Sequence, residues 1–269
     1  MCFALRSAAR IEQARDVWLG PMANILITGA SSGIGAALAR VYAKPDNRLV
    51  LWGRSAERLA LTAEQCRARG AAVETAAFDL TDLDRLVRML DAADAEAPLD
   101  LAIFNAGLGG SLPRERAGQD VAVAISMAGV NFTAPAVAAN FLAQRMAGRG
   151  RGRLVFVGSV AGFYPLPMAP LYSGSKAGLM MFAEALRLRL GKFGVTVTLV
   201  SPGFVDTPMS RSLKEPRPFL IGADQAAAIV ARKIARGARH IVVPWQFTVI
   251  GLAVRLVPRP LLRAVLSYF

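Results

Sequence analysis

Residues 23–35 read ANILITGASSGIG, and this stretch decides the fold. The apolar run 23–27 is typical of a buried β-strand, and Gly29, Gly33 and Gly35 follow it closely. Such glycines let the chain turn sharply and approach a phosphate, while the next helix offers unpaired N–H groups to the anion. The sequence therefore predicts a strand, a phosphate-binding turn and a helix. The spacing between Gly29 and Gly33 departs from the usual G-x-G-x-x-G fingerprint.

Three polar residues far downstream form a second candidate group. Tyr172 and Lys176 are four residues apart, which places both on one face of a helix. A phenol has an unperturbed pKa of about 10, and a nearby ammonium favours the phenolate, so we expect Lys176 to lower the pKa of Tyr172. Ser159 follows the apolar run 154–158, which places its hydroxyl at the carboxyl end of a strand, where open α/β sheets bind ligands. This pattern indicates acid–base chemistry.

With these motifs the chain resembles the short-chain dehydrogenases/reductases, which are tyrosine-dependent oxidoreductases. The motifs occur in the family order: TGxxxGxG at 28–35, Asn105-Ala106-Gly107, Asn131, Ser159, Tyr172-x-x-x-Lys176 and Pro202-Gly203. The resemblance implies a catalytic tetrad of Asn131, Ser159, Tyr172 and Lys176 and hydride transfer with a nicotinamide cofactor. It implies that Tyr172 protonates the alkoxide, that Ser159 binds the carbonyl oxygen, and that Lys176 binds the nicotinamide ribose. Asn131 would hold a water that relays protons to Lys176.

Cofactor choice can be argued from the end of the second expected strand. NAD-specific sites place an acid there for the ribose 2′-hydroxyl, whereas this chain has Arg54 and Ser55, which suit a 2′-phosphate. We therefore expect NADPH rather than NADH, unless Arg54 is only one of many solvated arginines. Asp79 matches the family's acidic residue near the adenine, and the alternative is an ordinary helix N-cap role for the stretch 79–82. The expected cofactor-binding residues are Thr28, Gly29, Ser31, Ser32, Gly33, Ile34, Gly35, Arg54, Asp79, Leu80, Asn105, Ala106, Gly107, Tyr172, Lys176, Pro202, Gly203, Val205 and Thr207.

Alternating strand and helix patterns extend along the rest of the chain. Helical segments include 32–43 and 59–69, and strands are expected near 24–28, 48–53, 73–77, 99–104, 153–158, 195–200 and 240–243. This alternation predicts an α/β fold: a single Rossmann-type doubly wound parallel sheet of about seven strands with helices on both faces. We expect this domain over residues 22–245. We expect residues 1–21 to be either an N-terminal extension or the result of an upstream start, and they lack the apolar core of a signal peptide.

Composition excludes several other function classes. His240 is the only histidine, and Cys2 and Cys66 are the only cysteines, so a multi-histidine metal site, a Ser-His-Asp triad and a disulfide framework are not expected. The net charge is +13, yet the arginines are scattered and no nucleic-acid motif is present. We expect no nucleic-acid partner. An anionic lipid surface or an acidic partner accounts for the charge more simply.

The C-terminal segment 246–269 is apolar and basic. The uncharged apolar stretch 241–254, which leads into it, is too short to cross a bilayer. Trp245 beside an apolar face with Arg255, Arg259 and Arg263 suits an interfacial segment that lies on a membrane. Two alternative roles for the segment fit the sequence equally well: a contact with another subunit, and a lid over the substrate pocket. We expect a cytoplasmic protein with peripheral contact to the inner membrane surface.

The expected substrate is a small carbonyl or alcohol compound of apolar character. The segments 160–168 and 204–221 carry apolar side chains near the expected site, which favours a hydrophobic ketone or aldehyde over a charged sugar. A homodimer or homotetramer is expected. The alternative is a non-catalytic dinucleotide-sensing or scaffold protein on the same fold. Loss of Tyr172 or Lys176 would have favoured that alternative, and both are present.

Overall fold

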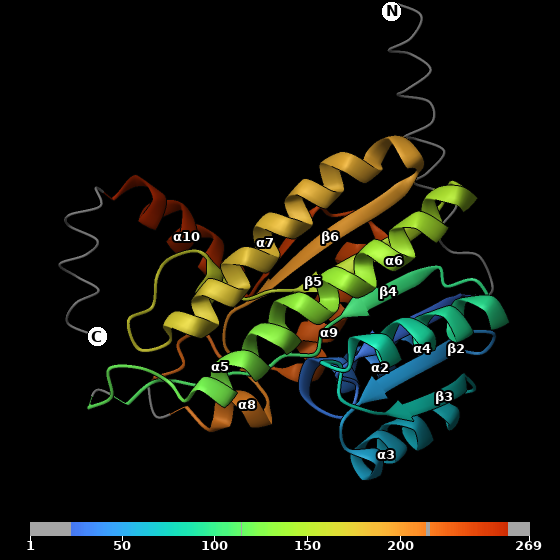
Figure 1. Ribbon diagram of the computed structural model, residues 1–269, viewed down its shortest axis with the longest axis horizontal. Coiled ribbons are helices and arrows are strands. Elements are labelled where there is room, and N and C mark those ends of the chain that lie inside the picture. Colours follow the sequence, from blue (N-terminus) through green and yellow to red (C-terminus); the bar gives the residue numbers. More distant parts are fainter. Residues whose placement is uncertain (1–22, 114, 214–215, 258–269) are drawn as a thin grey trace, which may run out of the picture.

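The computed structural model describes residues 23–113, 115–213 and 216–257, and every structural statement refers to these. In this part of the chain a seven-stranded parallel sheet runs through the centre of the molecule (Figure 1). Its order is β3 (Ala72–Ala77), β2 (Arg48–Gly53), β1 (Asn24–Thr28), β4 (Leu101–Phe104), β5 (Gly152–Val157), β6 (Val195–Pro202) and β9 (His240–Val243). The chain winds outward from β1 in one direction and from β4 in the other.

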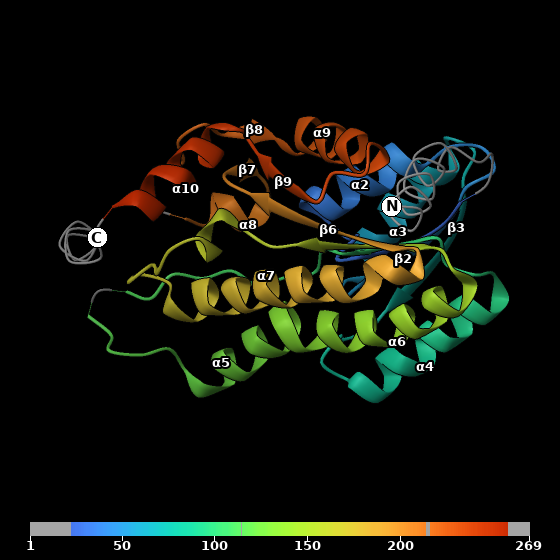
Figure 2. The same ribbon diagram turned by 90° about the horizontal axis from the view of Figure 1, so that it is seen from above.

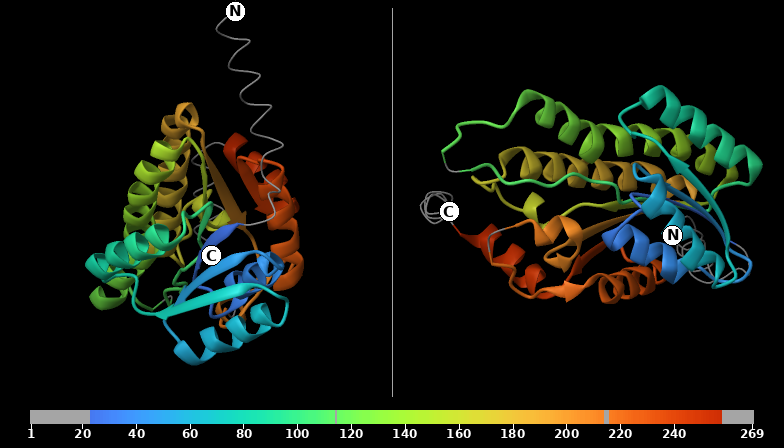
Figure 3. Two further views of the ribbon diagram at one scale, coloured as in Figure 1. Left: turned by 90° about the vertical axis from the view of Figure 1, so that its right-hand side faces the viewer. Right: turned by 90° about the horizontal axis from the view of Figure 1, so that it is seen from below.

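Helices cover both faces of the sheet, as Figure 2 shows from above and the end-on view in Figure 3 confirms. One layer contains α2 (Gly33–Tyr42), α3 (Ala56–Arg67) and α9 (Ala223–Ala235). The other contains α4 (Leu83–Glu96), α5 (Val121–Ala128), α6 (Ala134–Arg149) and α7 (Pro170–Leu190). Side chains alternate along each strand, so Ile25 and Ile27 pack with the first layer while Leu26 packs with the second.

The predicted doubly wound sheet is confirmed, and the expected strands differ from the observed ones by at most two residues at either end. The strand expected at 99–104 begins at Leu101. Leu99 instead donates its backbone N–H to the Asp94 side chain over 2.8 Å, outside the strand ladder. The helix expected over 59–69 begins earlier, at Ala56, because the Ser55 hydroxyl accepts from the Arg58 backbone N–H and caps it.

Several short elements were not predicted. A π-helical turn, η1 (Gly129–Thr133), joins α5 to α6, and a two-stranded parallel ladder joins β7 (Val205–Asp206) to β8 (Ile221–Gly222). The others are η2 (Val160–Gly162), η3 (Gly191–Phe193), α8 (Pro208–Arg211) and α10 (Gln246–Leu256). The expectations for residues 1–21, Arg259 and Arg263 fall outside the described residues.

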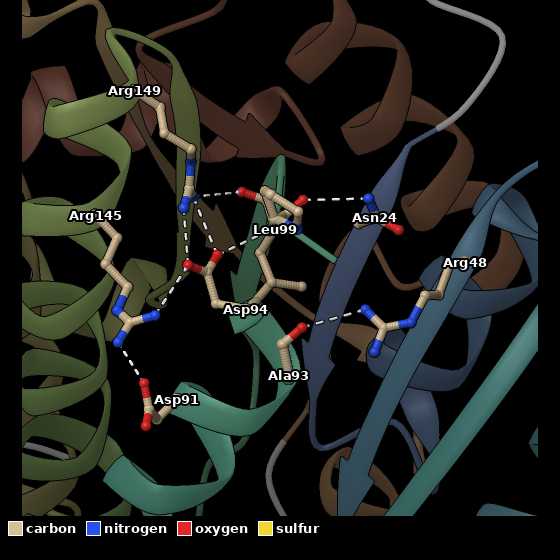
Figure 4. Close-up of polar contacts among 9 residues, drawn as sticks. Asn24, Arg48, Asp91, Ala93, Asp94, Leu99, Arg145 and Arg149 are labelled. Atoms are coloured by element: carbon tan, nitrogen blue, oxygen red, sulfur yellow. Dashed lines mark hydrogen bonds and ion pairs between the residues drawn. The ribbon is translucent and has the colours of Figure 1, made fainter. Parts of the chain in front are cut away.

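A buried carboxylate ties the second helical layer to the sheet (Figure 4). Asp94 of α4 accepts two hydrogen bonds from Arg149 of α6, at 2.7 and 3.1 Å, and a longer one from Arg145 at 3.5 Å. Arg149 also donates to the Leu99 carbonyl. Burial opposes ionisation of Asp94, but these hydrogen bonds outweigh it and lower the pKa of the carboxyl. The network holds α4, α6 and the turn before β4 together.

The continuous helical stretch Val121–Arg149 is long and apolar enough to cross a membrane by length and composition alone. It consists of α5, η1 and α6. In the structure α6 packs against the sheet through buried residues such as Ala138, Leu142 and Met146. Core helices of globular proteins satisfy the same criterion, and α6 is such a helix on its buried face. In α5, Val121, Val123 and Ile125 are exposed.

Candidate active site

A cavity of about 450 Å³ lies at the carboxyl ends of the strands. Its wall is formed by the segments that follow β1 to β6, so it spans the point between β1 and β4 where the winding direction reverses. Open α/β sheets bind their ligands at such a switch point. Strand order places the segments after β2 and β3 at one end, called here the β2–β3 end. The segments after β5 and β6 lie at the other, called the β5–β6 end.

The glycine-rich turn borders the middle of this cavity and is tightly constrained. Gly29 has a φ of +67°, and a Cβ there would lie 2.8 Å from the Ala106 Cα. A Cβ on Gly35 would overlap the Gly29 carbonyl oxygen, so the first turn of α2 packs directly on the loop. Only glycine fits either position. The sequence prediction of a sharp turn leading into a helix therefore matches the backbone.

Thr28 and Asn105 link this turn to the end of β4. The Thr28 hydroxyl accepts from the backbone N–H groups of Asn105 and Ala106, both at 3.1 Å. The Asn105 side chain donates to the carbonyl oxygens of Thr28 and Gly29 at 3.1 and 3.2 Å. Thr28 is buried and, like Gly35, lies behind the cavity wall. These contacts fix the loop shape rather than offer groups to a ligand.

Most of the sequence-predicted residues meet in the cavity wall. They are Gly29, Ser31, Ser32, Gly33, Ile34, Arg54, Asp79, Leu80, Asn105, Ala106, Gly107, Ser159, Tyr172, Lys176, Pro202, Gly203, Val205 and Thr207. Thr28, Gly35 and Asn131 are the predicted residues that do not line it.

Tyr172, in the first turn of α7, lies at the β5–β6 end with Ser159 and Lys176. Burial is the largest effect on Tyr172 and raises the pKa of its phenol, while a hydrogen bond with Ser159 opposes the rise. The expected net lowering of the Tyr172 pKa by Lys176 is therefore wrong for this structure. The ammonium lies 5.9 Å from the centre of the phenol ring and donates its hydrogen bond elsewhere. At neutral pH Tyr172 is a protonated phenol, the form that donates a proton.

Lys176 is held at the end of β5. Its Nζ donates to the Val157 carbonyl oxygen over 3.0 Å, and its side chain is buried. Burial lowers the pKa of this ammonium to about 8. The residue is thus poised to change protonation just above neutral pH, and it reaches the cavity beside Tyr172.

Asn131 lies behind the cavity, inside the π-helical turn η1. Its Oδ1 accepts from the Leu108 N–H at 2.8 Å, and its Nδ2 donates to the Leu108 carbonyl at 2.9 Å and to the Ser175 hydroxyl at 3.1 Å. Ser175 in turn donates to the Tyr172 carbonyl oxygen. Asn131 therefore connects the loop after β4 with the helix that carries Tyr172 and Lys176. A π-helical turn at a functional site is a recurrent feature.

Two arginines mark the β2–β3 end. Arg54 follows β2, and Arg58 lies one turn further along α3. Neither guanidinium forms a salt bridge among the described residues, so both remain available to an anion. The sequence prediction missed Arg58, because the helix expected over 59–69 begins after it, whereas α3 begins at Ala56 and includes it.

Asp79 lines the same end of the cavity, and its side chain accepts hydrogen bonds within the turn after β3. One of its carboxylate oxygens accepts from the Thr81 N–H at 2.9 Å and from the Thr81 hydroxyl at 2.8 Å. These hydrogen bonds lower the pKa of the carboxyl. The cap of α4 is Asp82, whose side chain accepts from the Arg85 N–H.

Apolar side chains dominate the β5–β6 end beyond Tyr172. Leu108, Met168, Phe204, Leu213 and Phe247 line it. Phe247 belongs to the first turn of α10 and packs edge-on against Phe204, with ring centres 6.0 Å apart. The C-terminal helix thus forms part of the cavity wall. Sequence reasoning did not single out Phe247, because nothing local shows which turn of an apolar segment meets the sheet.

His240 lies outside the cavity wall, at the start of β9. Its Nε2 is 2.9 Å from the Ser201 hydroxyl, and its ring packs edge-on against Phe163. Among the described residues no three His, Cys, Asp or Glu side chains are grouped closely enough to hold a metal ion.

Comparison with known proteins agrees with this geometry. The family model described as short chain dehydrogenase matches residues 23–218. An uncharacterized oxidoreductase of Myxococcus xanthus is 36% identical over 245 residues, which cover 89% of this chain and 94% of that protein. The chain belongs to the short-chain dehydrogenase family. It is an NAD(P)-dependent oxidoreductase of the class that interconverts CH–OH and C=O groups.

Two solved structures are similar over nearly their whole length. A short-chain dehydrogenase from Sphingobium yanoikuyae in complex with NADPH has a TM-score of 0.77 and 27% identity, over 88% of this chain and 97% of that one. A bulky-bulky ketone specific alcohol dehydrogenase from Comamonas testosteroni has a TM-score of 0.75 and 25% identity, over 89% and 96%.

Proposed function

We propose that this protein reduces a bulky apolar ketone or aldehyde to the alcohol with NADPH, or runs the reverse reaction, and that Tyr172 is its acid–base group. The observation that carries the proposal is the position of Tyr172, Ser159 and Lys176 in one cavity wall, next to an apolar pocket. The cavity also contains the glycine turn and two uncommitted arginines. No feature of the cavity favours the alternative of a non-catalytic sensor.

The residues of the cavity fit a phosphorylated dinucleotide. The loop Gly29–Gly33 and the N-terminus of α2 offer backbone N–H groups to a pyrophosphate. Arg54 and Arg58 offer guanidinium groups that form no salt bridge among the described residues, although the charge of Arg54 also acts on the carboxylate of Asp79. Such groups suit the 2′-phosphate that distinguishes NADPH from NADH. The structure of the Sphingobium relative with NADPH supports the same choice.

The chemistry then divides between cofactor and protein. The nicotinamide, when bound, supplies or accepts the hydride. Ser159 donates a hydrogen bond to the carbonyl oxygen of the substrate, and Tyr172 protonates that oxygen as negative charge develops on it. Lys176 would bind the nicotinamide ribose through the ammonium that it presents to the cavity beside Tyr172. Asn131 positions α7 through Ser175 and holds the water that returns a proton to Lys176.

The substrate class rests on the apolar β5–β6 end of the cavity. Leu108, Met168, Phe204 and Phe247 offer no charge to a sugar or an acid. The similarity to an alcohol dehydrogenase described as specific for bulky-bulky ketones supports the same class.

The test is a panel of ketones and aldehydes of increasing size, followed by NADPH absorbance, with Arg54→Asp as the diagnostic variant. Wild type should prefer NADPH and bulky apolar ketones. Arg54→Asp should lower the ratio of NADPH to NADH kcat/KM by about 10- to 100-fold, because a charge-assisted hydrogen bond is replaced by repulsion. Arg236→Asp, an exposed arginine at the end of α9, makes the same charge change away from the cavity and should leave the ratio unchanged. Wild type without NADPH-dependent turnover would contradict the proposal.

We also propose that residues 246–269 act as a segment distinct from the domain over 22–245, and that α10 makes peripheral contact with an anionic membrane surface. Trp245, Val249, Leu252 and Leu256 lie along one side of this helix and are 66%, 56%, 57% and 85% exposed. Phe247 and Gly251, on the other side, pack against the body of the protein. The net charge of +13 complements anionic lipid. We further propose that the protein is cytoplasmic and that it forms a homodimer or a homotetramer.

A further inference from the structure

The hydroxyl of Tyr164 is an uncommitted hydrogen-bond donor at the β5–β6 end of the cavity. Tyr164 lies between η2 and α7, in the segment that leads from Ser159 to Tyr172, and it lines the same cavity as both. Its side chain is partly buried, and no described residue hydrogen-bonds its hydroxyl. The hydroxyl is not among the fully buried polar atoms that lack a partner, so it is open to the cavity and can donate to a ligand placed there.

Other polar side chains in this part of the wall are already committed or lie in water. The Ser210 hydroxyl donates to the Val205 carbonyl oxygen over 2.6 Å and accepts from the Thr207 N–H. Ser159 accepts from the Ala161 N–H, and the proposed function assigns its donor to the carbonyl that is reduced. Ser111 is exposed. Thr207 also lines this part of the wall, and its hydroxyl accepts from the Ser210 N–H and caps α8. Tyr164 offers a hydroxyl to which no described residue is bound, and it can distinguish one apolar ligand from another by a hydrogen bond.

The protonation state of Tyr164 suits this role. Burial raises the pKa of its phenol, so the group is a neutral donor throughout the physiological pH range. A neutral phenol recognises a carbonyl, ether or hydroxyl oxygen. The neighbouring residues Leu166 and Met168 offer apolar contact to the carbon skeleton around that oxygen.

We propose that Tyr164 is a specificity-determining residue, which donates a hydrogen bond to a second oxygen of the substrate, separate from the carbonyl that is reduced at Tyr172. The inference rests on the proposed function. It narrows the proposed substrate class to bulky apolar ketones that carry a further carbonyl, ether or hydroxyl oxygen. Their carbon skeleton is a fused ring system or an open chain. Monoketones of the same shape bind the same pocket without this contact.

The test compares matched pairs of ketones that differ only by a second carbonyl, such as a fused bicyclic monoketone and the corresponding diketone. The pair that wild type reduces fastest is then measured with Tyr164→Phe, which keeps the ring and removes the donor. Wild type should prefer the diketone, and Tyr164→Phe should reduce that preference in kcat/KM by about 3- to 15-fold, as expected for one neutral hydrogen bond. Its kcat/KM for the monoketone should stay within about twofold of wild type.

Tyr42→Phe is the matched control. Tyr42 ends α2 outside the cavity, and its buried hydroxyl also lacks a partner in the described chain, so this variant removes a comparable group without touching the site. It should keep the wild-type preference. An unchanged preference in Tyr164→Phe, or a wild-type enzyme that reduces both ketones equally well, would overturn the inference and leave the proposed function standing. Absence of NADPH-dependent turnover with every pair would overturn both.

Discussion

At the scale of single residues, Lys176 has the property that is most easily measured. Its buried ammonium has a pKa of about 8, below the 10.5 of a free lysine. Between about pH 8 and 10.5 Lys176 binds fewer protons in the folded protein than in the unfolded chain. Its contribution to the free energy of unfolding therefore rises with pH over this range. The protonated ammonium is the form that donates to a ribose hydroxyl. The affinity for the cofactor should therefore fall as the pH rises.

We therefore predict that NADPH binds more weakly as the pH rises through about 8. The loss should approach 10-fold by pH 9.5, because a hydrogen bond from a charged donor contributes about 1.5–3 kcal/mol. Titration of NADPH fluorescence from pH 6.5 to 9.5 measures it. Lys176→Met keeps an unbranched apolar stem and removes the titrating group, so its affinity should be lower at pH 7 and nearly independent of pH. The same slope in wild type and in Lys176→Met would contradict the assignment.

At the scale of elements, α10 joins two surfaces. Phe247 faces the cavity and Leu252 faces solvent, so the helix connects the pocket wall with the exposed apolar side. An isolated exposed leucine is ordinary, whereas Trp245, Val249, Leu252 and Leu256 on one side of a helix form a continuous apolar strip.

The membrane contact of this apolar strip can be tested by comparing two leucine variants, one in the strip and one outside it. Leu252→Ser should weaken sedimentation with anionic vesicles by about 10-fold, since burial of one leucine side chain contributes about 1.5–3 kcal/mol. Leu61→Ser, on α3, changes a leucine of nearly equal exposure, 54% against 57%, and should bind vesicles like wild type. Wild type that ignores vesicles at low salt would exclude the membrane contact. A change in light-scattering mass in Leu252→Ser would then favour a subunit contact.

At the scale of the whole molecule, the sequence predicted what depends on local patterns. The strands and the glycine turn follow from apolar runs and from glycine positions, which are read within a few residues. The contacts of Asn131 could not be read in this way, because its partners Leu108 and Ser175 are 23 and 44 residues distant. The expected direction of the Tyr172 pKa shift was wrong for a related reason: the shift is set by burial, opposed by Ser159, and burial is a property of the folded chain.

The proton donor is the central claim, and Tyr172→Phe tests it most directly. This variant keeps the ring and removes the acidic hydrogen, so turnover of the best ketone should fall by about 10²- to 10⁴-fold, the usual contribution of general acid catalysis. The affinity for NADPH should remain within a few-fold of wild type, which shows that the site is still folded. Turnover of Tyr172→Phe within a few-fold of wild type, with NADPH binding intact, would contradict the account.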